Sequence, residues 1–316
     1  MCFYSWEKKR QRQEMDVALF EKIADEVFPR TRYLYLSCAT EPLMNKSFAS
    51  FLDRVGQYRV PFTSFCTNGQ LLTEAVVDSA IASGLSEIIF SVDGATAETY
   101  EDIRRGGKWD RLLSGLDLLR ARKEAAATHK PTARINFTCM NRNVEEMPDL
   151  VRVAKRHGIT NVHVRHLVAV PTEAAQETFR EEMAYRKVYN RISGEASRVA
   201  DELGVRLLLP DPVPEKPPTA RPAAREGRER NPYCLLPWMQ AIIKPDGGYQ
   251  LCSRLPNMGN LRRQSFNEIY HGPELSQIRR RLLRKSPEAC SWTCGHEAHA
   301  ASERPEEPAP GGQAER

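Results

Sequence analysis

Four cysteines in the last third of the chain have the residue type and spacing of a metal or cluster site. Cys234 and Cys252 are separated by a long segment, whereas Cys290 and Cys294 form one close pair. Four thiolates complete a tetrahedral site. Cysteines also form disulfides, but we expect no secretory signal and no oxidising compartment, so metal ligation is the favoured hypothesis. Structural zinc sites usually draw on two close pairs, so the looser spacing mildly favours an iron–sulfur cluster over zinc.

Further sequence runs accompany these cysteines. They are Cys234-Leu-Leu-Pro-Trp238, Lys244-Pro-Asp-Gly-Gly248, Met258-Gly-Asn-Leu261 and Phe266-Asn-Glu-Ile-Tyr270. Together they resemble the SPASM domain, the C-terminal auxiliary-cluster domain of radical S-adenosylmethionine (SAM) enzymes. The full family pattern has more cysteines, so this chain resembles the shortened "twitch" form. The resemblance implies one auxiliary [4Fe–4S] cluster, held by Cys234, Cys252, Cys290 and Cys294. His296 and His299 follow closely, but four thiolates already fill such a site.

The first residues, Met1-Cys2-Phe3, resemble the end of the C-x-x-x-C-x-x-C loop that binds the catalytic [4Fe–4S] cluster of radical SAM enzymes. The resemblance implies that Cys2 is a ligand of this barrel cluster. The two other cysteines of the loop would lie upstream of Met1, so we expect the chain to begin inside the loop. The alternative is that Cys2 is an ordinary N-terminal cysteine.

Apolar runs and helical periodicity alternate along the first two thirds of the chain. Strands are expected at residues 33–37, 61–66, 87–94, 133–139 and 161–170, with a further short strand at 205–209. Helices are expected at residues 15–28, 47–58, 74–83, 109–124, 146–157 and 173–203. This rhythm predicts an α/β fold with a parallel sheet and outer helices. The resemblance implies a partial (β/α)6 TIM-like barrel, whose first strand we expect to be missing because only five barrel strands are recognised.

Length and composition agree with a soluble chain of one large and one small domain, with 316 residues, 41% hydrophobic and 28% charged. We expect a radical SAM partial barrel at residues 1–209, a Pro-rich linker at 210–231, a small α+β SPASM/twitch domain at 232–296 and a disordered tail at 297–316. The formal charge of +5 is too small to favour a nucleic-acid partner. No apolar run approaches the ~20 residues of a membrane span, so we expect a cytoplasmic protein without a membrane partner.

Polar residues at the ends of the predicted strands match family motifs. Glu41, followed by Pro42, resembles the end of the G-G-E-P segment that holds the ammonium group of SAM, although Ala39 and Thr40 replace the two glycines. The run Thr67-Asn68-Gly69 resembles a family turn, which implies that Asn68 lies at the cofactor site.

The next strand end, Ser91-Val92-Asp93-Gly94, resembles the family's S-x-D-G motif, which implies that Ser91 and Asp93 border the bound nucleoside. An arginine shortly after it pairs with the SAM carboxylate in the family, a role that suits a bidentate guanidinium. Arg104 is the candidate for this role, and Arg105 is the second choice.

Asn136 and His166 lie on later strands and are expected at the open mouth of the barrel. The resemblance places Asn136 along the SAM site and His166 near adenine or substrate, although a strand histidine is more often a core or rim residue. Cys38, Cys66 and Cys139 lie at or near strand ends, and we interpret them as buried small hydrophobic residues, not ligands.

The resemblance implies a radical SAM oxidoreductase or maturase that oxidises or cross-links a peptide or small-molecule substrate through a 5′-deoxyadenosyl radical. Its cofactors would be SAM, an auxiliary [4Fe–4S] cluster and a barrel cluster, and its electron donor a flavodoxin or ferredoxin. No catalytic residue is assigned. The alternative is a non-catalytic protein that binds an iron–sulfur cluster or zinc, because the barrel-cluster loop contributes only Cys2 to this chain.

Overall fold

The computed structural model describes residues 14–37, 40–167, 183–213, 234–252 and 255–283. By their contacts the residues divide into two compact units, Met1–Arg228 and Glu229–Arg316, and each unit is considered by itself. None of the helices in these described stretches is both long enough and apolar enough to cross a membrane.

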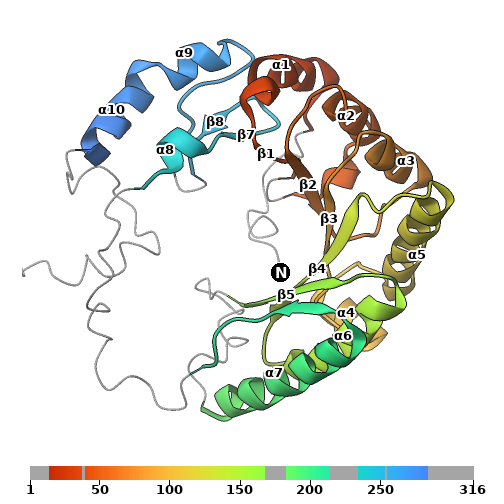
Figure 1. Cartoon of the computed structure of the whole chain (residues 1–316). Helices are drawn as coiled ribbons and strands as arrows, with labels where there is room; N and C mark the ends of the chain where they lie inside the picture. Colours follow the sequence, from red (N-terminus) through yellow and green to blue (C-terminus); the bar gives the residue numbers. More distant parts are fainter. Residues whose placement is uncertain (1–13, 38–39, 168–182, 214–233, 253–254, 284–316) are drawn as a thin grey trace, which may run out of the picture. The chain divides into compact units, whose positions relative to one another are not determined.

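The first unit is built on one parallel sheet whose strands lie in sequence order, from β1 to β6 (Figure 1). The strands are β1 (Tyr33–Tyr35), β2 (Phe62–Thr67), β3 (Glu87–Ser91), β4 (Thr132–Cys139), β5 (Asn161–His166) and β6 (Arg206–Leu208). Every neighbouring pair is parallel. Because each strand connects to the next through helical segments, all carboxyl ends lie at the same edge of the sheet.

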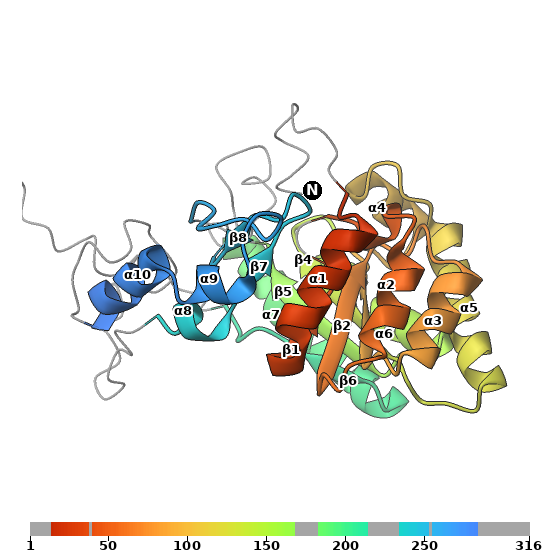
Figure 2. The same cartoon turned by 90° about the horizontal axis from the view of Figure 1, so that it is seen from above.

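Helices cover one face of this sheet (Figure 1). They are α1 (Val17–Val27), α2 (Phe48–Val55), α3 (Glu74–Ala82), α5 (Trp109–Ala125), α6 (Met147–Arg156) and α7 (Met183–Leu203). Figure 2 shows α1, α2 and α3 side by side, and the Phe20 and Phe51 rings stack at 4.1 Å between α1 and α2. Asp16 begins α1 by accepting from Leu19 N at 2.8 Å, as an N-cap residue does.

Alternation along the strands separates this helix-covered face from an inner face. On β4, Ile135 and Phe137 are at most 1% exposed, and on β2 Phe65 packs edge-to-face against Phe48 of α2 at 5.0 Å. Residues one position away point to the opposite side of the sheet. We call that side the inner face. Its side chains on β4 and β5 include Arg134, Asn136, Thr138, Asn161, His163 and Arg165.

The predicted α/β barrel-like fold is confirmed, with two differences in detail. The short strand expected at residues 205–209 was placed outside the barrel, but β6 pairs with β5 and extends the sheet to six strands. A three-residue strand is too short to show a period. The helix α4 (Ala97–Ile103), which is capped by Thr96 accepting from Thr99 N at 3.3 Å, was not predicted, because seven residues give only two turns of pattern.

The second unit has a small antiparallel hairpin of β7 (Ile242–Ile243) and β8 (Tyr249–Gln250), with three helices in its described part. These are α8 (Leu236–Met239), α9 (Phe266–Tyr270) and α10 (Pro273–Leu283). Ser265 and Glu268 form a capping box at the start of α9. The predicted domain boundaries stay predictions, because most of the expected linker and all of the expected tail lie outside the described residues.

Candidate functional site

Several residues expected to bind SAM meet at the carboxyl ends of β1 to β4, the edge of the sheet where loops carry chemistry. Glu41 lies in the loop after β1 and caps the short 3-10 turn Pro42–Met44 by accepting from Leu43 N at 3.3 Å. Its Oε1 also accepts from Thr67 Oγ1 at 2.7 Å, and its Oε2 accepts from Asn68 N at 2.7 Å. The carboxyl group is therefore fixed between the loop after β1 and the end of β2.

Burial raises the pKa of Glu41 above its usual 4.5, although its hydrogen bonds and the charge of Arg104 act in the opposite direction. A carboxylate oxygen can accept two hydrogen bonds, and Oε2 accepts one from the described residues. Oε2 therefore has capacity for a cationic donor, whose charge would favour the ionised form. This arrangement fits the ammonium group of SAM.

The turn after β2 orders Asn68. Thr67 Oγ1 accepts from Gly69 N at 3.0 Å, and Asn68 Oδ1 accepts from Gln70 N at 2.9 Å. Gly69 has a φ of +74°, a conformation that glycine adopts without strain. The buried Tyr100 hydroxyl donates to Asn68 O at 3.3 Å. Because Oδ1 is engaged in the turn, the Asn68 amide NH2 is the group left for a ligand.

Asp93 and Arg104 form an ion pair beside this turn. Asp93 Oδ2 lies 2.6 Å from Arg104 Nη2, and the Asp93 side chain is only 3% exposed. Asp93 Oδ1 accepts from Thr138 N at 2.8 Å. Gly94 permits the close approach of α4, because a Cβ at this position would lie 2.7 Å from Tyr100 N.

Arg104 also has an unused donor. Its Nε is buried and has no hydrogen-bond partner among the residues that the structure describes. A carboxylate beside it would satisfy that donor, so the Arg104 guanidinium fits the SAM carboxylate that the sequence resemblance implied. Arg105, the second choice, is exposed.

Ser91 lies on the inner face, with its Oγ 3.1 Å from Cys66 Sγ. Cys66 is half-buried, so its interpretation as a buried hydrophobic residue was wrong. Strand alternation turns it towards the inner face, away from the helices. Cys139 is fully buried, as expected, and burial raises the pKa of its thiol. Cys38 lies outside the described residues.

The two polar residues expected at the barrel mouth point to opposite faces of the sheet. Asn136 is on the inner face, where its Oδ1 accepts from Arg134 Nη1 at 3.1 Å. His166 lies on the helix-covered face of β5, the same face as the buried Val162 and Val164. Its ring packs edge-to-face against Tyr189 of α7 at 4.6 Å. The expectation that His166 faces the mouth was therefore wrong, and the alternative, a histidine that packs at the core or rim, agrees with its contact with Tyr189.

Two residues that connect the loops of the site by hydrogen bonds were not predicted from the sequence. Asn143 donates from Nδ2 to Asp93 O at 3.0 Å and to Thr138 O at 2.9 Å, which ties the loops after β3 and β4 together. Glu146 Oε2 accepts from Ala95 N at 2.5 Å. Both precede α6, and in sequence they are indistinguishable from ordinary residues of a helix start.

In the second unit, Cys234 is exposed and Cys252 is half-buried. Cys290 and Cys294, like Cys2 of the first unit, lie outside the described residues. Within the described ranges no three His, Cys, Asp or Glu side chains gather as metal ligands do. Cys234 and Cys252 supply two of the four cysteines in the donor set of the predicted cluster.

Arg279 of α10 fixes the turn that follows Cys234. Its Nε and Nη2 donate to Pro237 O at 3.0 and 2.8 Å, and its Nη1 donates to Tyr270 O at 2.7 Å. The guanidinium also stacks on the Tyr270 ring at 4.1 Å, and the Tyr270 hydroxyl donates to Trp238 O at 3.1 Å. These contacts hold α8, the helix next to one predicted cluster ligand.

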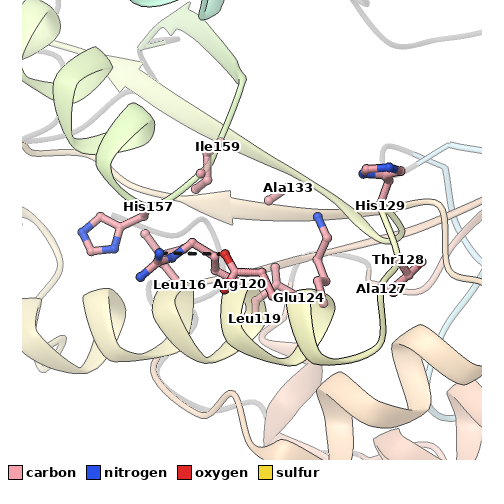
Figure 3. A pocket seen from close by; sticks show the side chains of 12 residues that line it. Leu116, Leu119, Arg120, Glu124, Ala127, Thr128, His129, Ala133, His157 and Ile159 are labelled. Carbon is pink, nitrogen blue, oxygen red and sulfur yellow. Dashed lines mark ion pairs between the residues drawn. The ribbon is translucent and has the colours of Figure 1, made fainter.

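A pocket of about 410 Å³ lies elsewhere in the first unit (Figure 3). Its lining includes Ala133, at the start of β4, and Ile159, just before β5, together with Leu116, Leu119 and Arg120 of α5. This places it at the amino ends of the strands, opposite the edge that carries Glu41 and Asp93. It is therefore separate from the candidate site.

Two family models match the chain. Residues 1–129 match the radical SAM superfamily, and residues 234–295 match SPASM, an iron–sulfur cluster-binding domain.

Among curated proteins, the AdoMet-dependent heme synthase of Methanosarcina barkeri is 29% identical over 241 residues, 72% of this chain and 64% of that protein. The mycofactocin maturase MftC of Mycobacterium tuberculosis is 28% identical over 153 residues, 48% of this chain and 37% of that protein. The chain thus spans less than two thirds of either relative.

A solved structure shares the fold. Streptococcus suis SuiB bound to S-adenosylmethionine superposes with a TM-score of 0.61 at 14% sequence identity, covering 86% of this chain and 62% of that chain. At this identity the likeness concerns the fold alone. It agrees with the parallel six-stranded sheet and outer helices of the first unit.

Proposed function

This chain belongs to the radical SAM superfamily and carries a SPASM iron–sulfur domain, and we propose that it oxidises or cross-links a peptide or small-molecule substrate. The domains imply [4Fe–4S] clusters and SAM as cofactors. When bound and reduced, this pair supplies a 5′-deoxyadenosyl radical that abstracts a hydrogen atom from the substrate. The cofactors carry this chemistry, and the protein supplies binding and orientation.

The observation that carries the proposal is the group of charges at the carboxyl edge of the sheet. Glu41 presents a buried carboxyl group, and Arg104 presents a guanidinium held by Asp93. We assign Glu41 to the ammonium group of SAM and Arg104 to its carboxylate, with Asn68, Ser91 and Asp93 along the remainder of the cofactor. Asn136, the register partner of Ser91, was also expected along the SAM site, and we assign it instead to the substrate. Opposite charges on either side fix one orientation of an amino-acid group.

We assign Cys234 and Cys252, together with Cys290 and Cys294, to the auxiliary cluster, and Cys2 to the barrel cluster. When bound, an auxiliary cluster would supply an electron acceptor at the site, which supports an oxidation or a cross-link as the outcome. The names of the two relatives, a heme synthase and a maturase, support modification of a small molecule or of a precursor. A flavodoxin or ferredoxin is the proposed electron donor.

The test is formation of 5′-deoxyadenosine from SAM by the natural full-length protein, with clusters reconstituted and reduced by dithionite without oxygen. We expect the wild-type protein and the control Glu21→Gln, which lies on the exposed side of α1, to form 5′-deoxyadenosine. We expect Glu41→Gln to bind SAM at least about tenfold more weakly, because one charge-assisted hydrogen bond is lost. Cluster-loaded protein that forms none would overturn the proposal and favour the non-catalytic alternative.

The pH dependence of SAM binding is a second test of the role assigned to Glu41. Protonation removes the charge of Glu41, and burial raises its pKa, so affinity should fall as the pH decreases towards that raised pKa. The fall should begin at a higher pH than for an ordinary glutamate. In Glu41→Gln this part of the pH profile should disappear, as measured by equilibrium dialysis of labelled SAM. A profile that is the same in both proteins would contradict the assigned role of Glu41.

A further inference from the structure

An ordered polar network lies on the inner face at β3, β4 and β5. Arg134 forms a bidentate ion pair with Glu87, with Nε 3.0 Å from Oε1 and Nη2 2.9 Å from Oε2. The two side chains are only 11% and 13% exposed. The remaining guanidinium nitrogen, Nη1, lies 3.1 Å from Asn136 Oδ1 and 2.8 Å from His163 Nδ1. One fixed guanidinium thus contacts two neighbouring polar side chains.

These contacts determine which atoms of Asn136 and His163 remain for a ligand. A guanidinium only donates, so Asn136 Oδ1 and His163 Nδ1 are both acceptors. In the neutral imidazole the proton is then on Nε2, and burial and the charge of Arg134 favour the neutral ring by lowering the pKa of His163. Asn136 keeps its NH2 group. Two N–H donors therefore belong to partner positions of adjacent strands, whose backbones lie about 4.8 Å apart.

The charge around this donor pair is positive. Arg165 is the next residue after His163 on the inner face, two positions along β5. Arg206 on β6 is the register partner of Asn161, which is the inner-face residue before His163. Both arginines are exposed, and neither has a carboxylate partner in the described part of the chain. A step along one face of a strand is about 6.6 Å, within the reach of an arginine side chain. Glu87 is already paired with Arg134, so two positive charges remain.

An apolar group lies in the same row. Leu208 on β6 is the register partner of His163 and is 52% exposed. Ser91, Asn136 and His163 are successive partners across β3, β4 and β5. The row therefore runs from the proposed cofactor residues, through two N–H donors, to an exposed leucine.

We propose that Asn136, His163, Arg165 and Arg206 form a binding site for a carboxylate group of the substrate, with Leu208 against the adjoining apolar part. Arg134 acts as a positioning residue, because it fixes the amide of Asn136 and the tautomer of His163. The proposal adds to the proposed function that the substrate has an acidic group. It rests on the proposed function only for the identification of the bound molecule as the substrate. The binding itself requires neither SAM nor turnover.

The test uses glutarate as the probe, with uncharged glutaramide as its matched control. Equilibrium dialysis of labelled glutarate is performed on the cluster-loaded full chain without SAM, at low ionic strength. We expect saturable binding of glutarate and none of glutaramide, and at least about tenfold weaker binding of glutarate by the double variant Arg165→Gln/Arg206→Gln. The control Arg111→Gln, an exposed position on α5, should bind glutarate as the wild-type chain does.

Three outcomes would overturn the proposal. One is the absence of saturable glutarate binding, and another is equal affinity in the wild-type chain and the double variant. The third is complete displacement of glutarate by SAM, which would assign the site to the carboxylate of the cofactor. A failure of the proposed function would be seen separately, as cluster-loaded protein that forms no 5′-deoxyadenosine while glutarate binding is retained.

Discussion

At the scale of single residues, Asp93 connects three separate parts of the candidate site. Its carboxylate accepts from the Thr138 backbone N–H and pairs with Arg104, and its own carbonyl accepts from Asn143. The residue therefore fixes the loops after β3 and β4 and also orients the guanidinium assigned to the SAM carboxylate. Structure and proposed binding depend on the same side chain.

Replacing Asp93 by asparagine should be costly. The change leaves Arg104 without its carboxylate, and because that side chain is 26% exposed, water compensates in part. We expect a loss of about 2 kcal/mol in the free energy of unfolding, below the ~3–5 kcal/mol of a fully buried pair. Urea unfolding followed by far-ultraviolet circular dichroism measures it.

The matched control is Asp102→Asn, which removes an ion pair with Arg142 in which the side chains are 65% and 43% exposed. Exposed pairs contribute little, so the change should stay within about 0.5 kcal/mol. Equal effects of the two variants would contradict the structural role of Asp93.

The sequence predicted Glu41, Asn68, Ser91 and Asp93 as site residues because short motifs follow the strands, and the structure brings these residues to one edge of the sheet. It failed where the facing of a side chain matters. His166 was named as a candidate and His163 was overlooked, although the alternation of the apolar Val162 and Val164 assigns His166 to the helix-covered face.

At the scale of elements, long periodic segments were predicted closely, whereas the place of one short strand and the existence of one short helix were not. The helices α1, α2, α3, α5 and α6 lie within about three residues of their expected ends, because several turns of apolar pattern define them. The strand β6 was predicted, but only its pairing with β5 shows that it belongs to the sheet. The helix α4 is too short for a pattern, and its capping by Thr96 identifies it.

The helix α8 should depend on Arg279 for its position. Arg279→Ala removes three hydrogen bonds to the Pro237 and Tyr270 carbonyls and a stacking contact. Because α8 follows Cys234 directly, we expect the variant to retain less than about half of the auxiliary-cluster iron and sulfide after buffer exchange. Residues that orient a metal ligand without binding the metal themselves have effects of about this size or larger.

Arg280→Ala is the control for this experiment, because Arg280 lies on the exposed side of the same helix. It should retain cluster as the wild-type chain does. Full retention by Arg279→Ala would show that the turn after Cys234 needs no such support.

At the scale of the whole molecule, the chain consists of two units that carry different halves of the cofactor chemistry. The first unit holds Glu41 and Arg104, which we assign to SAM, and the second holds Cys234 and Cys252, which we assign to the auxiliary cluster. Motifs with fixed residues could be recognised in both. The substrate could not be predicted, because the groups proposed to bind it come from β4, β5 and β6, far apart in sequence and adjacent only through strand register.

The measurement that tests this account most directly is the iron, acid-labile sulfide and zinc content of the chain, purified and reconstituted without oxygen. The wild-type chain and Cys234→Ser/Cys252→Ser are compared. We predict that the double variant loses about four iron and four sulfide per chain, the content of one cubane held by four thiolates. Zinc without sulfide in the wild-type chain, or an unchanged iron content in the double variant, would contradict the auxiliary cluster.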